Sequence, residues 1–164
     1  MGRTSPSAAA NTMRPMGTGT ADYFDHHSRD YHPRRLRAAV RWVGMLAEPG
    51  DSLFDVGCGT GLILERIAKV AKEAVGIDLS EGMAQGARER GLDVQIGSVT
   101  DLPFEDESFD LTYSFKVLAH VPDIETAIRE AVRVTRPGGH LLLELYNTWS
   151  LRYLAKKVAG PQPI

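Results

Sequence analysis

Apolar positions in this chain follow two alternating patterns: short apolar runs, and longer segments with apolar residues at every third or fourth position. Short runs predict buried strands, and the longer spacing predicts helices with one face toward a core. The predicted strands are Ser52–Val56, Ala74–Ile77, Leu92–Ile96, Phe109–Ser114 and His140–Tyr146. The predicted helices run from Ala21 to about Ala47, from Leu62 to Ala71, from Ser80 to about Arg90, and onward from Asp123.

Ser80 and Asp123 carry side-chain oxygens that can cap the helices they begin. A turn is predicted at Pro137–Gly138–Gly139. The spacing also predicts which residues of two helices face the core: Ile63, Ile67, Val70 and Ala71 in one, and Ile124, Ala127, Ile128, Ala131 and Val132 in the other.

Strands separated by helices imply right-handed crossovers and therefore a doubly wound, mostly parallel α/β sheet with helices on both faces. In such sheets ligands bind beyond the carboxyl ends of the strands. The residues that follow the first four strands are the glycine loop 57–61, Asp78, Ser98 and Phe115. We therefore expect four loops to face one crevice.

The composition is that of one globular domain, because the chain has 164 residues of which 43% are hydrophobic and 24% charged. The net charge of -2 gives no basic field, so neither nucleic acid nor a membrane is an expected partner. Cys58 is the only cysteine, which excludes an intrachain disulfide and fits a reducing cytoplasm. His26, His27 and His32 lack the spacing of a helical zinc motif, and no metal site is predicted.

Pattern and composition divide the chain into four parts. Residues 1–21 are expected to be a disordered tail, 22–49 a helical cap, 50–147 a ligand-binding core and 148–164 a truncated helical segment. The strand His140–Tyr146 is then a leucine-rich sheet edge, a feature that proteins usually cover. Either the chain is a fragment of a longer protein or another chain covers this edge.

The loop Gly57–Gly61 has glycine at alternate positions where a strand turns into a helix. Glycine permits positive φ and close approach of a ligand, and a helix N-terminus offers unpaired N–H donors. A dinucleotide fingerprint would need a further glycine at Leu62 or Leu64. Asp78 ends the next strand, where a carboxylate can bind ribose hydroxyls. These features predict a nucleoside without a diphosphate; the alternative is a tight turn with Asp78 as a helix cap.

Five segments follow one another along the chain: LFDVGCGTG, VGIDLS, LPFEDESFD, HVPD and RVTRPGGHLLLE. With these segments the sequence resembles the class I S-adenosylmethionine-dependent methyltransferases over roughly residues 50–147. The small-molecule group that includes ubiquinone and menaquinone biosynthesis methyltransferases is the most similar, and Phe24-Asp25 with Ser28 and Tyr31 resembles its N-terminal aromatic segment. The resemblance implies a Rossmann-like sheet of order 3-2-1-4-5 that lacks the last two strands of the methyltransferase fold.

The resemblance also implies S-adenosyl-L-methionine as the cofactor and a small molecule as the methyl acceptor, at oxygen, carbon or nitrogen. By this resemblance the loop residues Gly57, Cys58, Gly59 and Gly61 would lie along the methionine and ribose portions of the cofactor. Asp55 would lie near the methionine amino group.

Further contacts implied by the resemblance come from the next loops. Asp78 would bind the ribose hydroxyls, and Leu79 and Met83 would sandwich the adenine. Phe115 would offer its backbone to the methionyl end.

The sequence departs from the family pattern at two places. Ser98 and Val99 stand where the family often has Asp-Ala to bind the adenine amino group, a contact that Ser98 or Asp101 could supply. Ala119 stands where the family usually has Glu. His120 is the candidate general base, because imidazole exchanges protons near neutral pH, and a structural role is the alternative.

The leading hypothesis is thus a methyltransferase that acts on a small molecule. The alternative is a catalytically silent cofactor-binding module or partner subunit, which Ser98, Ala119 and the short C-terminus favour. A nicotinamide oxidoreductase is a third hypothesis, and tight binding of NADH would support it.

Overall fold

The computed structural model describes residues 33–145 of the chain. The predicted tail 1–21, residues 22–32 of the predicted cap and the predicted C-terminal helix 148–164 lie outside the described residues. The N-terminal histidines and the aromatic segment around Phe24 also lie outside them.

Helices and strands alternate along the described chain. The helices are α2 (Pro33–Leu46), α3 (Leu64–Ile67), α4 (Glu81–Arg88), the short 3₁₀ helix η1 (Leu118–His120) and α5 (Ile124–Val134). The strands are β1 (Ser52–Val56), β2 (Glu73–Asp78), β3 (Asp93–Ile96), β4 (Phe109–Ser114) and β5 (Thr135–Leu143). Neighbouring strands pair in parallel in the order β3-β2-β1-β4-β5. The expected α/β class and strand order are confirmed.

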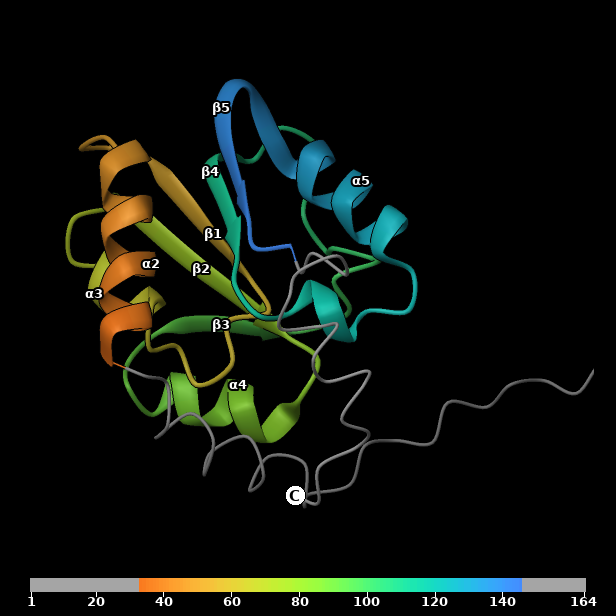
Figure 1. Ribbon diagram of the computed structural model, residues 1–164, viewed down its shortest axis with the longest axis horizontal. Coiled ribbons are helices and arrows are strands. Elements are labelled where there is room, and N and C mark those ends of the chain that lie inside the picture. The colour runs from red at the N-terminus through yellow and green to blue at the C-terminus, as the bar shows by residue number, and fades with distance from the viewer. Residues whose placement is uncertain (1–32, 146–164) are drawn as a thin grey trace, which may run out of the picture.

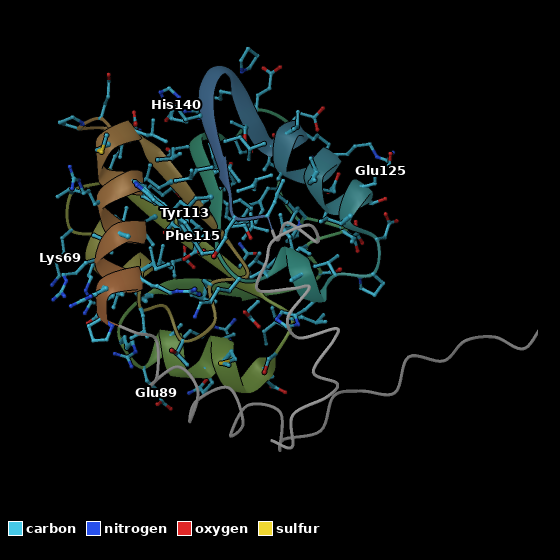
Figure 2. All side chains as sticks on the ribbon, viewed as in Figure 1. Lys69, Glu89, Tyr113, Phe115, Glu125 and His140 are labelled. Carbon is cyan, nitrogen blue, oxygen red and sulfur yellow. The ribbon has the colours of Figure 1, made fainter. Side chains whose placement is uncertain are left out.

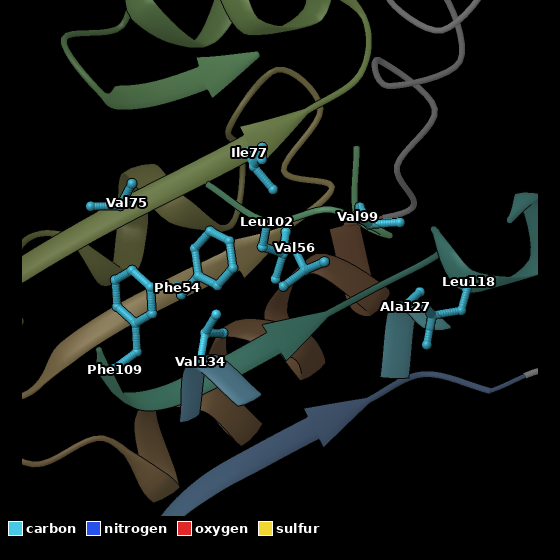
Figure 3. Packing of buried hydrophobic residues seen from close by; sticks show 10 residues of the cluster. All are labelled: Phe54, Val56, Val75, Ile77, Val99, Leu102, Phe109, Leu118, Ala127 and Val134. Atoms are coloured by element: carbon cyan, nitrogen blue, oxygen red, sulfur yellow. The ribbon is translucent and has the colours of Figure 1, made fainter. Parts of the chain in front are cut away.

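Helices cover both faces of the sheet (Figure 1). On one face α2 and α3 pack against β1 and β4, and the shared cluster includes Ala39, Val43, Leu53 and Leu111. α4 covers β2 and β3 on the same side. On the other face α5 packs against a cluster drawn in Figure 3, which includes Phe54, Val56, Phe109, Ala127 and Val134. Every residue of β1 is buried, as expected for a central strand between two helical layers.

The helix predicted over Leu62–Ala71 is wrong in length, since α3 spans only Leu64–Ile67. Hydrogen bonds from the Arg66 N–H to the Ile63 carbonyl and from the Val70 N–H to the Ile67 carbonyl join residues three apart. They are mixed with bonds between residues four apart, such as the one from the Ala68 N–H to the Leu64 carbonyl, so the regular helix stays short. Val70 consequently points to solvent rather than to the core.

The core-facing stripe of α5 is shifted from its expected position. Ala127, Ala131 and Val134 are buried, and Ile128 is partly buried against the same cluster. Ile124 and Val132 are exposed, so their assignment to the core was wrong. The small side chains of the two alanines let the helix approach the sheet closely, which leaves no room for larger residues along that line.

Residues 137–139 form part of β5 rather than a separate turn before it. The register of β4 with β5 moves from Phe109↔Thr135 to Leu111↔His140, so β5 carries extra residues in a bulge. Gly138 has a φ of 83°, and a Cβ at Gly139 would collide with the backbone of Asp110. The two glycines therefore allow the backbone of the bulge at the start of β5. The strand ends at Leu143 rather than at Tyr146.

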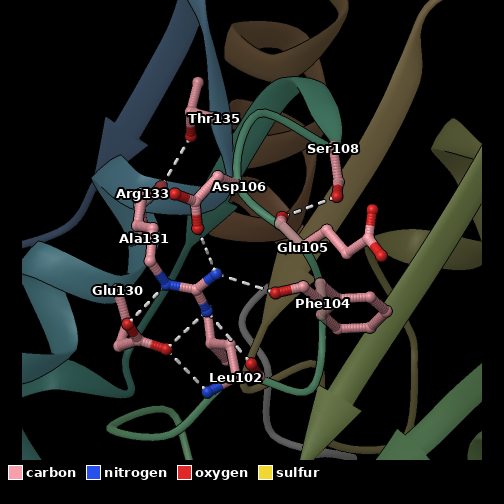
Figure 4. Close-up of polar contacts among 9 residues, drawn as sticks. All are labelled: Leu102, Phe104, Glu105, Asp106, Ser108, Glu130, Ala131, Arg133 and Thr135. Carbon is pink, nitrogen blue, oxygen red and sulfur yellow. Dashed lines mark hydrogen bonds and ion pairs between the residues drawn. The ribbon is translucent and has the colours of Figure 1, made fainter.

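The Arg133 guanidinium group ties α5 to the loop that precedes β4 (Figure 4). It donates to Glu130 at 2.7 Å and to Asp106 at 2.9 Å. It also donates to the carbonyls of Phe104 at 2.8 Å and Leu102 at 3.1 Å. Several charge-assisted hydrogen bonds on one planar group fix the loop in place. The segment LPFEDESFD thus has a structural role here.

Candidate functional site

The carboxyl ends of the strands bring the predicted loops to one edge of the sheet. Because all strand pairs are parallel, the residues after β1, β2, β3 and β4 leave the sheet on the same side. These residues are the loop 57–61, Asp78, Ser98 and Phe115. The four loops predicted from the alternation of strands and helices therefore lie on one side of the sheet.

The glycines of the loop have positive φ, namely 78° at Gly57, 58° at Gly59 and 77° at Gly61. A Cβ at Gly57 would collide with Val117, and one at Gly61 would collide with Leu92. Those two glycines are required by the packing of the chain itself. A Cβ at Gly59 would meet nothing within 4 Å. Gly59 is thus the glycine of the three whose backbone faces open space into which a ligand can enter.

Asp78 connects the glycine loop to the start of α4. One carboxylate oxygen accepts the Gly59 N–H at 2.8 Å, and the other accepts the Ser80 N–H at 2.9 Å. Burial raises the pKa of Asp78, and the N–H groups of Ser80 and Gly59 oppose that rise. Ser80 itself caps α4, because its hydroxyl accepts the Met83 N–H at 3.4 Å. Each carboxylate oxygen has a second lone pair, so Asp78 can hold the loop and also accept hydrogen bonds from a ligand.

Asp55 is a buried acid on β1, only 3% exposed, directly before the loop. Burial is the main cause that raises its pKa from 3.8 to about 8, and the nearby charge of Asp78 adds to the rise. The neighbouring Tyr113 hydroxyl acts in the opposite direction. In the absence of a ligand, Asp55 is therefore mostly a neutral carboxylic acid at neutral pH.

Cys58 packs inside the loop against β2. A Cβ at Gly76 would come within 2.7 Å of the Cys58 sulfur, so the glycine on β2 makes room for this side chain. Burial, followed by the charges of Asp55 and Asp78, raises the pKa of the thiol. The thiol stays protonated, and Cys58 fills space rather than acting as a nucleophile.

The remaining predicted contacts differ in how open they are. Leu79 is 56% exposed after the end of β2, where the adenine contact is expected. Met83, Val99 and Phe115 are buried, so little of their side-chain surface is open to a ligand. Ser98 forms a hydrogen bond with the Thr100 hydroxyl at 2.7 Å.

Further residues at this edge of the sheet lie after β4 and β5. His120 is exposed on η1. Lys116 has a φ of 62°, a strained conformation for a lysine, and its N–H donates to the Glu144 carboxylate at 3.1 Å. Sequence reasoning missed Lys116, Glu144 and Tyr113, because no spacing marks a strained residue or a buried hydroxyl beside an acid.

Two surface grooves lie away from this edge. One is between α5 and β5, next to Arg133 and Leu141, and the other is between α2 and Arg66. Within residues 33–145 no three His, Cys, Asp or Glu side chains gather as metal ligands would. None of the helices in that range has the length and apolar character needed to cross a bilayer.

A five-stranded parallel sheet, a glycine loop after its central strand and an acid at the end of the next strand define a Rossmann-like class of domain. Residues 54–143, more than half of the chain, match the family model described as a methyltransferase domain. The chain belongs to this methyltransferase family.

Relatives of known name agree with this membership. The chain is 34% identical to the ubiquinone biosynthesis O-methyltransferase of Alkalilimnicola ehrlichii over 132 aligned residues. The alignment covers 76% of this chain and 53% of the relative. It resembles the structure of a SAM-dependent methyltransferase from Thermotoga maritima, with a TM-score of 0.70, 28% identity and coverage of 84% and 65%. A [4+2]-cyclase, SpnF, is 35% identical with a TM-score of 0.57, over 65% of this chain and 44% of SpnF. The chain spans about half the length of the curated relatives it matches.

Proposed function

We propose that residues 50–147 are the S-adenosylmethionine-binding core of a methyltransferase that transfers a methyl group to a small molecule. The observation that carries the proposal is the pairing of Gly59 with Asp78. The Gly59 backbone faces open space at positive φ, and its N–H is held by a carboxylate that has further lone pairs. Family membership, and a relative named as a ubiquinone biosynthesis O-methyltransferase, support the reaction and the acceptor class.

The proposed contacts with the cofactor come from each of the four loops. Asp78 would accept the two ribose hydroxyls, and the exposed Leu79 would cover one face of the adenine. Met83 and Val99 would contact the adenine with the small part of their side chains that is exposed, and Ser98 would accept a hydrogen bond from its amino group. The proposed contacts at the methionyl end are Asp55, Gly57, Cys58, Gly59, Gly61 and the backbone of Phe115.

When bound, S-adenosylmethionine supplies a methyl group on a positively charged sulfur, ready for displacement by a nucleophile in line. The chain has to hold the acceptor against this methyl group and keep water out, and such alignment lowers the barrier by several kcal/mol. His120 would accept a proton where the acceptor is a hydroxyl or an amine. The single cysteine supports a reducing cytoplasm as the location.

Calorimetric titration of the full chain with S-adenosylmethionine, S-adenosylhomocysteine and NADH tests this function. We expect micromolar binding of the first two and none of NADH. Asp78→Ala should weaken the binding of S-adenosylhomocysteine by about 2 kcal/mol or more. The substitution removes both ribose contacts and the carboxylate that accepts the Gly59 N–H. Binding of NADH alone, or no binding by a folded chain, would refute the assignment.

A cofactor-binding chain without methyl transfer is the second candidate. The likeness to SpnF, which is named as a cyclase, shows that a related fold can carry another name and reaction. Among the described strands β5 pairs only with β4, which leaves an edge that a second chain could cover. Recovery of a stoichiometric partner together with cofactor binding, and no methylation of any acceptor, would favour this candidate.

A further inference from the structure

Tyr113 carries a buried hydroxyl that has no hydrogen-bond partner among the described residues. Its side chain is fully buried, and buried tyrosine hydroxyls normally have a partner. Its neighbours on β4 are satisfied. Ser114 donates to the Val56 carbonyl at 2.8 Å. Thr112 accepts from Thr135 at 2.8 Å on the opposite face of the sheet. The exception at Tyr113 therefore requires a physical reason.

Asp55 is the polar group beside this hydroxyl. The register of β1 with β4 places Asp55 opposite Tyr113. Both residues lie on the sheet face covered by α2, and Figure 2 shows Tyr113 and Phe115 between the strands and that helix. The side chains that surround Tyr113 from α2 and from the start and end of α3 are apolar, namely Ala39, Val43, Ile63 and Ile67. The helical layer thus offers the hydroxyl no acceptor.

The titratable groups around Asp55 come from three places in the fold. Tyr113 stands on β4, Asp78 ends β2 and Cys58 belongs to the glycine loop. Burial raises the pKa of Asp55 to about 8. The pKa of Tyr113 is also raised, chiefly by burial, so its hydroxyl keeps its proton and remains a donor.

This pair of side chains has two states. The Tyr113 hydroxyl lies near enough to Asp55 to affect its pKa but makes no hydrogen bond of good geometry, and a neutral carboxylic acid is a weak acceptor for it. An ionised carboxylate accepts hydrogen bonds more strongly than a neutral acid does, and a nearby cation favours the ionised form. A positively charged ligand at the loop would therefore switch the pair from the first state to the second.

We propose that Tyr113 is a positioning residue that couples ligand binding at the glycine loop to loss of a proton from Asp55. As the ammonium group of the ligand arrives, the O–H bond of the Asp55 carboxyl group breaks and the proton leaves to the solvent. The carboxylate then faces the cation and accepts a hydrogen bond from the Tyr113 hydroxyl. The inference rests on the proposed function, because it requires a cationic ligand beside Asp55.

The number of protons released on binding tests this coupling. S-Adenosylhomocysteine is titrated into the full chain by calorimetry, in two buffers of different ionisation enthalpy. At about pH 6.5 we expect the release of close to one proton for each ligand bound, and at about pH 8.5 much less, since most Asp55 is then already ionised. The affinity should rise with pH between these values.

Three variants separate the roles of the residues. Asp55→Asn should release no proton at either pH. Tyr113→Phe should bind S-adenosylhomocysteine about tenfold more weakly near neutral pH, because the Asp55 carboxylate has lost the hydroxyl that donates to it. For the same reason the rise of affinity with pH should occur at a higher pH than in the wild type. Its thermal midpoint should not fall, since the deleted hydroxyl had no partner. Thr112→Val, the control, removes a bonded hydroxyl from the same strand and should lower stability while leaving proton release unchanged.

The outcomes distinguish this inference from the function on which it rests. Failure of the folded wild-type chain to bind S-adenosylhomocysteine at pH 8.5 overturns both. Binding without proton release at pH 6.5, or a Tyr113→Phe variant with wild-type affinity and pH dependence, overturns the coupling alone.

Discussion

Single residues in the glycine loop have different tasks although they share one motif. Gly57 and Gly61 are glycines because Val117 and Leu92 occupy the space of a side chain. Gly59 has open space beside it. The motif was recognisable in the sequence, but this division of tasks was not, because Val117 and Leu92 are distant from the loop along the chain. Tyr113 was hidden for the same reason: a buried strand position looks apolar until its neighbour across the sheet is known.

Gly59→Ala should reduce the affinity for S-adenosylhomocysteine by tenfold or more, because a methyl group would occupy the space the ligand needs. Gly91→Ala is the matched control, since Gly91 also has positive φ, 80° against 58°, and open space beside it. Both variants should lose about 1 kcal/mol of stability from the strained backbone. Equal affinities of the two variants, measured by calorimetry, would show that the loop at Gly59 is only a turn.

Asp55→Asn should stabilise the ligand-free chain at pH 8. The folded-state pKa of about 8 lies above the ordinary value of 3.8, so the folded chain holds a proton that the unfolded chain has lost. Stability therefore falls as pH rises through this window, and asparagine removes that loss. We expect a gain of at least about 1 kcal/mol at pH 8, since one pKa unit corresponds to about 1.4 kcal/mol. Denaturant unfolding at pH 4 and pH 8 measures it, and a gain at pH 4 alone would contradict it.

His120→Ala should slow methyl transfer without changing the affinity for S-adenosylhomocysteine, if the imidazole accepts the proton of the acceptor. A single-turnover assay and a binding titration of the same preparation separate the two effects. An unchanged rate would assign His120 a structural role on η1.

At the scale of elements, β1 and β4 matched their predicted bounds, whereas α3 and β5 did not. Both strands are short segments whose residues are almost all buried between the two helical layers, and their apolar residues are bounded by turn residues, so local pattern and tertiary packing agree. Around the short α3, hydrogen bonds between residues three apart are mixed with bonds between residues four apart, and β5 starts inside a bulge against β4. Both features depend on contacts with other parts of the fold, and local spacing does not encode them.

Arg133→Lys should destabilise the chain by about 2 kcal/mol, because one ammonium group cannot replace a guanidinium bonded to two carboxylates and two carbonyls. The ion pair with Asp106 contributes little to this loss of stability, since the Asp106 side chain is 75% exposed. Arg129→Lys, on the same helix, is the control and should change stability by less than about 0.5 kcal/mol.

The pH dependence of the Arg133→Lys effect follows from Glu130. Arg133 lowers the pKa of Glu130 below its ordinary 4.5. The stability that the Arg133–Glu130 interaction contributes is fully present above the ordinary pKa of Glu130. It is lost as pH falls through the folded-state pKa of Glu130. Urea unfolding should therefore show a smaller difference between variant and wild type at pH 3 than at pH 7, and a constant difference would contradict the argument.

At the scale of the whole molecule, the strand order places β1 in the centre of the sheet and β3 and β5 at its edges. The alternation of strands and helices predicted the parallel sheet and its binding edge, and the resemblance added the order. The acceptor pocket could not be predicted, because acceptor sites are built from variable loops.

Amide hydrogen exchange should follow this order in the full chain. The amides of β1 and β4 should exchange slowest, because they lie between two helical layers, and those of β3 fastest among the strands. Slow exchange along the outer side of β5 would show that this edge is covered in solution. Addition of S-adenosylhomocysteine should slow exchange at Gly59 most strongly, and no change there would contradict the placement of the ligand.

Cys58 gives this chain a natural reporter of its own binding loop. The thiol is the only one in the sequence, and it lies against Gly76 with its proton retained. The residue is partly exposed, and movement of the loop away from β2 should speed the reaction of its thiol with a thiol-specific dye, so the labelling rate reports loop movement. Because no cysteine has to be added or removed, loop opening can be followed on the unaltered protein, with and without ligand, by the colour change of a single reaction.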